Sequence, residues 1–185
     1  MRKTVQVCLL IVAMMTAALL VIDSLSVVRT GTGNGGAILW DNSFEAFCDE
    51  LTADCTSDGE KVSVFREWVI RNIAYDEECE TLFYQTFDVG KVMQNRKGVC
   101  FDYSCLFAAM CRSQGIPCYV LDGTYRTDST FRHAWNRVYY DGQWWSLDTT
   151  RDHTARIDGS SEYGIIAIGH DPHAEDKYFL INQVF

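Results

Sequence analysis

The spacing of apolar residues changes at Pro117, from a helical period before it to alternation after it. The clearest helical pattern runs from Cys100 to Gly115 and carries apolar residues on almost every side. A helix of this kind has little surface suited to water, so we expect it to lie inside the domain. Gly115 favours a helix end, and Pro117 prevents the helix from continuing.

Three further helices are predicted upstream, each with a residue at its start whose side chain can cap it. Their expected ranges are 44–53 after Ser43, 57–72 beginning at Ser57, and 88–93 beginning at Asp88. All three precede the buried helix, so the first part of the domain is predicted to be mainly helical.

After Pro117, alternating residues predict strands over 118–125, 132–140, 143–147 and 178–181. The dipeptide Asp141-Gly142 between two of these strands is typical of a hairpin turn. Residues 150–159 show neither period and are expected to be irregular. Helices followed by an antiparallel meander indicate an α+β fold.

The N-terminus carries a separate signal. Residues 5–22 form an almost unbroken apolar run behind the basic start Met1-Arg2-Lys3. This is typical of a cleaved signal peptide or an uncleaved membrane anchor, which we assign to residues 1–28. The basic flank would stay cytoplasmic, so the rest is expected to be extracytoplasmic and to meet the membrane only through this segment. Glycines over 29–42 predict a flexible linker, and residues 43–185 the domain.

The composition indicates one globular domain with a sizeable core. Of the 185 residues, 48% are hydrophobic and 13% are aromatic, which argues against disorder. The formal net charge of −9 disfavours nucleic acid as a partner. The glycine-rich stretch lacks the Gly-Lys-Ser/Thr ending that a phosphate-binding loop needs, so nucleotide binding is not expected.

The chain has eight cysteines, of which Cys8 lies in the N-terminal apolar run. An odd number remains, which in an exported protein suggests one free thiol and up to three disulfides. With Cys100 free, the disulfide candidates are Cys48, Cys55, Cys79, Cys105, Cys111 and Cys118. The most local pairs are Cys48 with Cys55 and Cys111 with Cys118. Alternatively, several of these thiols are reduced and buried.

Three residues have the order and placement of a nucleophile, a base and an orienting carboxylate. Cys100 lies in the first turn of a helix, where free N–H groups and the helix dipole favour a thiolate. His133 and Asp148 lie at similar distances from the Asp141-Gly142 turn, so we expect them to be nearly opposite each other across the hairpin. Asp148 could then hold one ring nitrogen of His133 and direct the other toward Cys100.

Each residue also has an ordinary structural interpretation. Cys100 could be a buried core residue, His133 a hydrogen-bonded strand residue and Asp148 a turn carboxylate. A metal site is a further alternative, because His153, His170 and His173 lie among acidic residues of the tail. Histidines in an acidic, turn-rich tail are more often exposed, so no metal and no cofactor are expected.

Several motifs together resemble the transglutaminase-like superfamily. They are Trp68 to Asp76, Gly98-Val99-Cys100-Phe101-Asp102-Tyr103, Gly115-Ile116-Pro117, Gly123, His133-Ala134-Trp135-Asn136, Trp145-Ser146-Leu147-Asp148 and Asp176 to Leu180. The resemblance implies a papain-like, transglutaminase-core fold, with the nucleophile helix packed on an antiparallel sheet. By position it implies a catalytic triad of Cys100, His133 and Asp148. The flanking β-domains of animal transglutaminases and a calcium-loop pattern are missing from this sequence.

These features predict an exported, thiol-dependent acyl-transfer enzyme that acts on a peptide or protein. We expect a peptidase or amidase that passes through a Cys100 thioester. The alternatives are a cross-linking transglutaminase and an inactive binding module on the same fold. The Cys100 backbone N–H is expected to stabilise the oxyanion, with Tyr75 as a candidate second donor. Trp135 is a candidate lining residue of the substrate groove.

Overall fold

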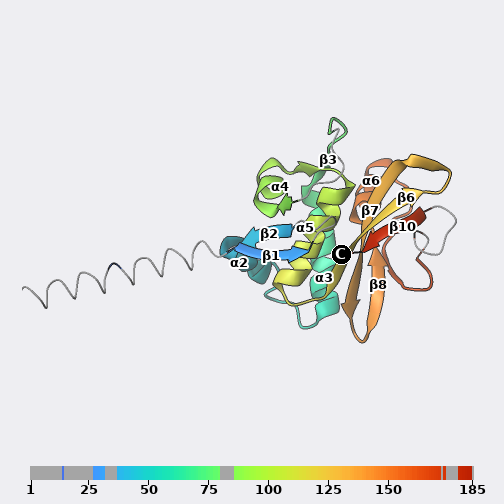
Figure 1. Cartoon of the computed structure of the whole chain (residues 1–185). Helices are drawn as coiled ribbons and strands as arrows, with labels where there is room; N and C mark the ends of the chain where they lie inside the picture. Colours follow the sequence, from blue (N-terminus) through green and yellow to red (C-terminus); the bar gives the residue numbers. More distant parts are fainter. Residues whose placement is uncertain are drawn as a thin grey trace, which may run out of the picture.

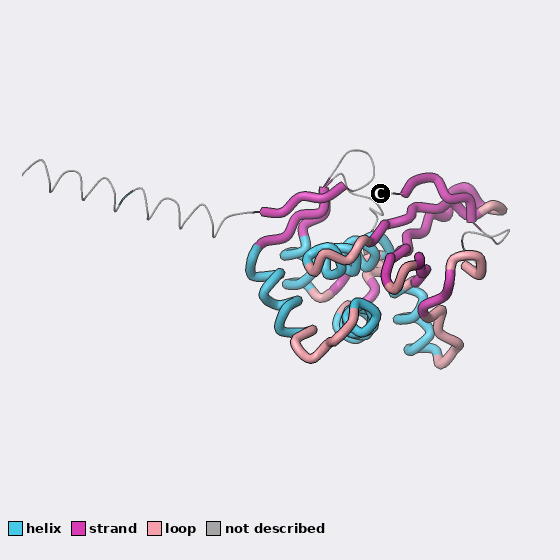
Figure 2. Tube along the Cα trace, turned by 90° about the horizontal axis from the view of Figure 1, so that it is seen from below, coloured by secondary structure: helices cyan, strands magenta, loops and turns pink. Residues whose placement is uncertain are grey.

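The computed structural model describes residues 27–31, 37–79, 86–171, 173 and 179–184, together with Met14. In Figure 1 the helices α2, α3 and α4 lie on one side of α5, and the strands β6, β7, β8 and β10 lie on the other. The same division is visible from below in Figure 2. The expected α+β architecture is therefore observed, with the predicted buried helix at its centre.

Four of the helices were expected from the sequence. Their bounds are α2 Asn42–Leu51, α3 Asp58–Asn72, α4 Val89–Asn95 and α5 Cys100–Ser113. Ser57 and Asp88 cap α3 and α4 as predicted, whereas α2 is capped by Asp41, whose carboxylate accepts the Phe44 N–H at 3.0 Å. The predicted ends of these helices are within a few residues of the observed ones.

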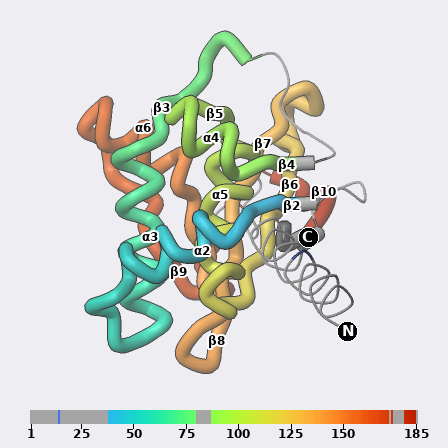
Figure 3. Tube along the Cα trace, turned by 90° about the vertical axis from the view of Figure 1, so that its left-hand side faces the viewer, coloured from blue at the N-terminus to red at the C-terminus, as the bar shows by residue number. Residues whose placement is uncertain are grey.

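Helix α5 is the centre of the core. Every residue from Cys100 to Cys111 is buried, which confirms the expectation of an internal helix. It contacts α2, α3, α4 and α6 as well as the strands β6 and β7. Figure 3 shows α2 and α4 on the side of α5 that faces away from the sheet, with α3 beside α5. Burial on all sides fixes the position of Cys100 at its first residue.

A fifth helix, α6 Thr149–Asp158, occupies a segment that was expected to be irregular, so that prediction was wrong. The Asp148 carboxylate caps it by accepting the Arg151 N–H at 2.9 Å, and Gly159 ends it in a left-handed conformation. Its buried residues are threonine, aspartate and alanine, not large apolar side chains. The helix therefore has no apolar stripe that a periodicity argument could detect.

The main sheet has five antiparallel strands in the order β10-β6-β7-β8-β9. Their bounds are β6 Cys118–Tyr125, β7 Asp128–Tyr140, β8 Gln143–Leu147, β9 Ile165–Ala167 and β10 Phe179–Val184. The hairpin at Asp141-Gly142 is confirmed, and both of its residues have positive φ. Strand β9 was not expected from the sequence. The observed sheet thus has one more strand, next to β8, than the predicted meander.

The segment expected to be a flexible linker contains two strands, β1 Val27–Gly31 and β2 Ala37–Asp41. They pair antiparallel, and β2 pairs in parallel with β4 Thr86–Asp88. Ile38 and Trp40 of β2 are buried in the core. The expected linker was wrong for these residues, because their apolar side chains outweigh the neighbouring glycines.

Two parallel two-residue strands, β3 Ala74–Tyr75 and β5 Lys97–Gly98, place the end of α3 beside the start of α5. Apart from Met14, residues 1–26 lie outside the described part of the chain, so most of the predicted signal peptide or anchor over 1–28 does too, whereas Val27 and Val28 belong to β1. None of the described helices is both long and apolar enough to span a bilayer.

All seven cysteines in the described ranges are free thiols, so the disulfides expected from the cysteine count are not formed. Burial raises the pKa of Cys105 and Cys111 well above the ordinary thiol value. It also raises the pKa of Cys48 to about 11. These three thiols therefore behave as small core residues and are poor nucleophiles.

Candidate active site

Cys100 is the first residue of α5, directly after the short strand β5. Its backbone N–H is one of the groups at a helix start that have no partner within the helix. Asp102 secures this start, because its Oδ2 accepts the Val99 N–H at 2.8 Å. A Cβ on Gly98 would lie 2.6 Å from the Cβ of Asp102, so only glycine fits there. The nucleophile candidate is therefore held by backbone geometry on both sides.

His133 and Asp148 come together as the sequence predicted. His133 lies in β7, and Asp148 follows β8 as the cap of α6. The distance from His133 Nε2 to Asp148 Oδ2 is 2.6 Å. Cys100 interacts with the same imidazole and contributes to raising its pKa. Since Nε2 faces Asp148, Nδ1 is the nitrogen left for Cys100. The three predicted residues thus form one continuous Cys–His–Asp chain.

The electrostatics of the site favour a protonated His133. Burial of the ring lowers its pKa, but the charge and hydrogen bond of Asp148 and the contact with Cys100 together raise it to about 10. Burial raises the pKa of Asp148, while the two histidines that contact it outweigh this effect and leave its pKa well below the ordinary value. An imidazolium beside Cys100 is the charge partner that a thiolate nucleophile requires.

Tyr75, the candidate second donor, lies in β3 beside the strand that leads into Cys100. It pairs with Gly98 in the β3–β5 ladder and is half-buried. Burial raises the pKa of Tyr75, and the charge of Cys100 raises it further. The hydroxyl is therefore neutral and able to donate a hydrogen bond near the nucleophile.

Trp135 does not line a groove, so that expectation was wrong. Its side chain is fully buried, in a small cluster with Leu121 and Phe179. Its ring lies parallel to the His133 ring, with centroids 6.1 Å apart and an interplanar angle of 14°. Trp135 supports the imidazole from behind the site and has no surface to offer a substrate.

His173 also belongs to this site, although no pattern in the sequence indicated that it would. Its Nε2 lies 2.8 Å from Asp148 Oδ2, the same oxygen that contacts His133. From the sequence, His173 was a candidate only as a metal ligand in the tail. No spacing signal connects it to Asp148, because the two residues are 25 positions apart.

The tail histidines are not gathered into one metal site. His153 Nδ1 contacts the Ile70 carbonyl at 2.9 Å, and His170 is exposed. Among the described residues, the nitrogens of His133 and His173 and an Asp148 oxygen do lie within 4.8 Å of one another. Their separations of 2.6 and 2.8 Å match ordinary hydrogen bonds between imidazole and carboxylate. The described contacts in this group are therefore those of hydrogen bonds.

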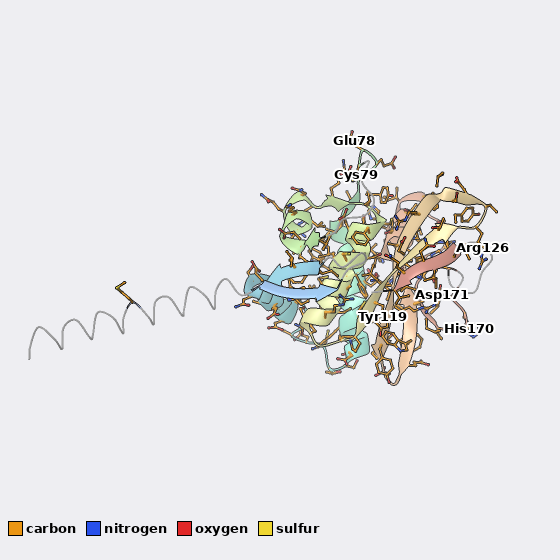
Figure 4. All side chains as sticks on the ribbon, viewed as in Figure 1. Glu78, Cys79, Tyr119, Arg126, His170 and Asp171 are labelled. Atoms are coloured by element: carbon orange, nitrogen blue, oxygen red, sulfur yellow. The ribbon has the colours of Figure 1, made fainter. Side chains whose placement is uncertain are left out.

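A cavity of about 230 Å³ adjoins the start of α5. It is lined by Lys97, Gly98 and Asp102 from the nucleophile segment, and by Asp76 and Cys79 from the segment after α3. Figure 4 shows Cys79 and Glu78 on the loop after β3, at the opposite side of the molecule from His170 and Asp171.

The family model of the transglutaminase-like superfamily matches residues 45–149, which is more than half of the chain. This range contains all three residues described above, Cys100, His133 and Asp148. The chain belongs to the transglutaminase-like superfamily. The motifs from Trp68 to Asp148 that suggested this membership from the sequence all lie inside the matched range.

Two curated relatives of this transglutaminase-like domain are the kyphoscoliosis peptidases of mouse and human. Each is 32% identical to it, over 111 and 116 residues respectively, and each match covers 55% of the chain. The matched region is only 17% of the mouse protein and 18% of the human one. The chain therefore corresponds to a small part of these relatives.

Solved structures agree on the fold. A candidate cysteine protease from Cytophaga hutchinsonii superposes with a TM-score of 0.51 and 21% identity, over 78% of this chain and 49% of that one. The periplasmic domain of TgpA from Pseudomonas aeruginosa, bound to ethylmercury, gives a TM-score of 0.50 and 21% identity, over 63% and 46%. The expected papain-like, transglutaminase-core fold is confirmed.

Proposed function

We propose that this domain is a thiol-dependent acyl-transfer enzyme that cleaves an amide bond in a peptide or protein. The observation that carries the proposal is the contact of 2.6 Å between His133 Nε2 and Asp148 Oδ2, on an imidazole whose pKa Cys100 also helps to raise. Nucleophile, base and orienting carboxylate are the three parts that acyl transfer through a thiolate needs.

In the first half-reaction the Cys100 thiolate, whose proton is held by the His133 imidazolium, attacks the amide carbonyl carbon. The Cys100 backbone N–H stabilises the oxyanion that forms, and the half-buried Tyr75 is the candidate second donor. His133 then gives its proton to the leaving amine as the C–N bond breaks. A thioester on Cys100 and a free amine result.

In the second half-reaction His133 removes a proton from water, which attacks the thioester. The products are a carboxylic acid and the regenerated thiol. An amine in place of water would give a cross-link by the same steps. Hydrolysis is favoured, because water needs no acceptor site and because the curated relatives are named peptidases. No cofactor enters either step.

We also propose that the domain acts outside the cytoplasm. The apolar run over 5–22 behind a basic start supports this, as either a cleaved signal or an anchor. The fold is shared with the periplasmic domain of TgpA, which is consistent with an extracytoplasmic setting. Cell fractionation with residues 1–28 present or deleted tests the proposal: a protein found in the cytoplasm in both cases would contradict it.

Thiol labelling tests the catalytic proposal without knowledge of the substrate. Cys100 is only 2% exposed, so a small reagent such as iodoacetamide is used. We expect Cys100 to react at pH 6–7 far faster than Cys55, a partly exposed cysteine between α2 and α3. The variants Cys100→Ala and His133→Ala should both lose this fast phase, whereas the control Cys55→Ala should keep it.

If Cys100 is labelled no faster than Cys55, the enzyme proposal fails. It also fails if His133→Ala leaves the labelling rate of Cys100 unchanged. Either result would favour an inactive binding module instead. Incorporation of a fluorescent amine into protein substrates separates the two enzyme classes. Efficient incorporation that depends on Cys100 would identify a cross-linking transglutaminase.

A further inference from the structure

We propose that His173 is a positioning residue of the catalytic site, which holds Asp148 in the orientation that directs His133 Nδ1 toward Cys100. This inference rests on the proposed thiol-dependent function. The observation behind it is that one oxygen, Asp148 Oδ2, contacts two imidazoles, His133 Nε2 at 2.6 Å and His173 Nε2 at 2.8 Å.

The protonation of this group follows from the charge of Asp148. The pKa of this carboxyl is well below its ordinary value, so the side chain is an acceptor only. Both ring nitrogens that face it must then carry a proton. His133 keeps its proton on Nε2, so the proton that it exchanges with Cys100 is the one on Nδ1. His173 supplies the second donor to the same oxygen.

Complete pairing matters here because Asp148 is fully buried. Its Oδ1 accepts the Arg151 N–H at 2.9 Å, so the carboxylate receives three hydrogen bonds in all. A buried carboxylate without such partners is strongly destabilised. Without His173, Oδ2 would keep a single donor, and the carboxylate could turn away from His133. The second histidine therefore leaves the carboxylate one favourable orientation.

His173 is itself held rigidly. It is buried, and its ring is stacked on Tyr163 with centroids 4.9 Å apart and an interplanar angle of 14°. Its backbone N–H donates to Asp171 Oδ1 at 2.9 Å, and the Tyr163 hydroxyl donates to the same Asp171 oxygen. Tyr163 in turn lies 3.1 Å from the Ser146 hydroxyl on β8. A hydrogen-bonded path thus connects the sheet to Asp148 through His173.

His173 does not act on the substrate directly. It touches Asp148 and meets the edge of the His133 ring, with centroids 5.5 Å apart and an interplanar angle of 69°. The ionisable neighbours of its ring are His133, Asp148 and Tyr163, and Arg137 pairs with Asp171 at 3.7 Å behind it. Its effect on catalysis must therefore pass through Asp148.

The test compares two amide substitutions that differ in reach. The amide nitrogen of His173→Gln can occupy the position of Nε2 and donate to Asp148. In His173→Asn the amide is one methylene shorter and cannot reach that oxygen. His173→Phe keeps the aromatic packing without any donor. The rate of Cys100 labelling by iodoacetamide is measured from pH 5 to pH 10 with EDTA present, alongside the melting temperature.

We expect His173→Asn and His173→Phe to label Cys100 about 10- to 100-fold more slowly at pH 7, the range expected for one lost hydrogen bond to a charged group. Their pH profiles should move toward that of an ordinary thiol. His173→Gln should stay within about threefold of wild type, with its profile unchanged. A purely structural role would alter melting temperatures but would not produce this difference between the two amides.

Wild-type rates and profiles in both His173→Asn and His173→Phe would overturn the proposal. So would a folded His173→Gln that is as slow as His173→Asn. If His173→Phe does not fold, the comparison of His173→Gln with His173→Asn still tests the proposal. Failure of the proposed enzyme function gives a different result, because wild-type Cys100 would then be unreactive or insensitive to His133→Ala in the same experiment.

Discussion

His133 and Asp148 are diagonal neighbours on one face of the sheet, not direct cross-strand partners. The register pairs Asn136 with Leu147, so one further step sets Asp148 level with Trp135. His133 lies two residues from Trp135 on the same face, and its ring reaches across to Asp148 at 2.6 Å. The sequence predicted that the pair would be nearly opposite. The extra step leaves room for Trp135 to pack against the imidazole.

Replacing Asp148 by asparagine should disable His133 as a base. The amide presents either an NH2 group or a weaker acceptor to two imidazole N–H groups, so the favoured tautomer of His133 changes. We expect Cys100 labelling at pH 7 to fall by about three to four orders of magnitude, as for loss of the orienting carboxylate in related chemistry. A reduction of less than tenfold in a folded variant would contradict this role.

His133 should make stability fall as the pH rises. Its pKa is raised from the ordinary value of 6.5 to about 10 in the folded protein. This stabilisation is fully present below pH 6.5 and is lost as the pH rises through 10, because the folded state holds a proton that the unfolded state releases. Urea unfolding at several pH values measures the slope.

The matched control for this slope is His133→Gln, which cannot titrate. Its free energy of unfolding should vary less between pH 7 and 10 than that of wild type, by the slope expected for one proton. Cysteine and tyrosine ionisation in the unfolded state affects both proteins equally, so the difference isolates His133. Parallel curves for the two proteins would show that His133 is not held protonated.

Gly123 should be needed to keep Trp135 in place behind His133. A Cβ at Gly123 would lie 2.6 Å from the edge of the Trp135 ring. Gly123→Ala should therefore cost about 1–3 kcal/mol, as overpacked cores do, and should slow Cys100 labelling as the ring moves. In Gly123→Ala with Trp135→Phe, the smaller ring should recover part of the stability. Equal melting temperatures for Gly123→Ala and wild type would exclude this close packing.

The ion pair between Arg66 and Asp152 should be a main support of the packing of α3 on α6. Arg66 Nε lies 2.8 Å from Asp152 Oδ2, and both side chains are buried. Arg66 also pairs with Glu162. Removing one partner of a buried pair leaves an uncompensated charge, so Arg66→Gln should lower the free energy of unfolding by about 3–5 kcal/mol.

Two comparisons give this prediction its control. Arg71→Gln removes an exposed pair with Glu67 on the same helix and should cost less than about 1 kcal/mol. Arg66→Met with Asp152→Leu removes both buried charges and should recover most of the lost stability. If Arg66→Gln and Arg71→Gln unfold at the same denaturant concentration, the buried pair contributes little.

The elements that were predicted well are those with strong local sequence patterns. Helix α5 could be found because apolar residues surround it and Gly115 and Pro117 end it. The β7–β8 hairpin could be found because Asp141 and Gly142 adopt the positive φ angles that its turn requires. With these two elements known, Cys100, His133 and Asp148 could be selected from the sequence alone.

What the sequence determined, therefore, was the order of the elements and the three residues of the Cys–His–Asp chain, because periodicity, turn chemistry and spacing act over short stretches. Tertiary structure decided the rest. It buried Trp135 behind His133, formed α6 without an apolar stripe, paired β1 with β2 and kept the described cysteines as thiols. It also brought His173 to Asp148 across 25 positions of sequence. Such contacts depend on packing between distant segments, which no local pattern records.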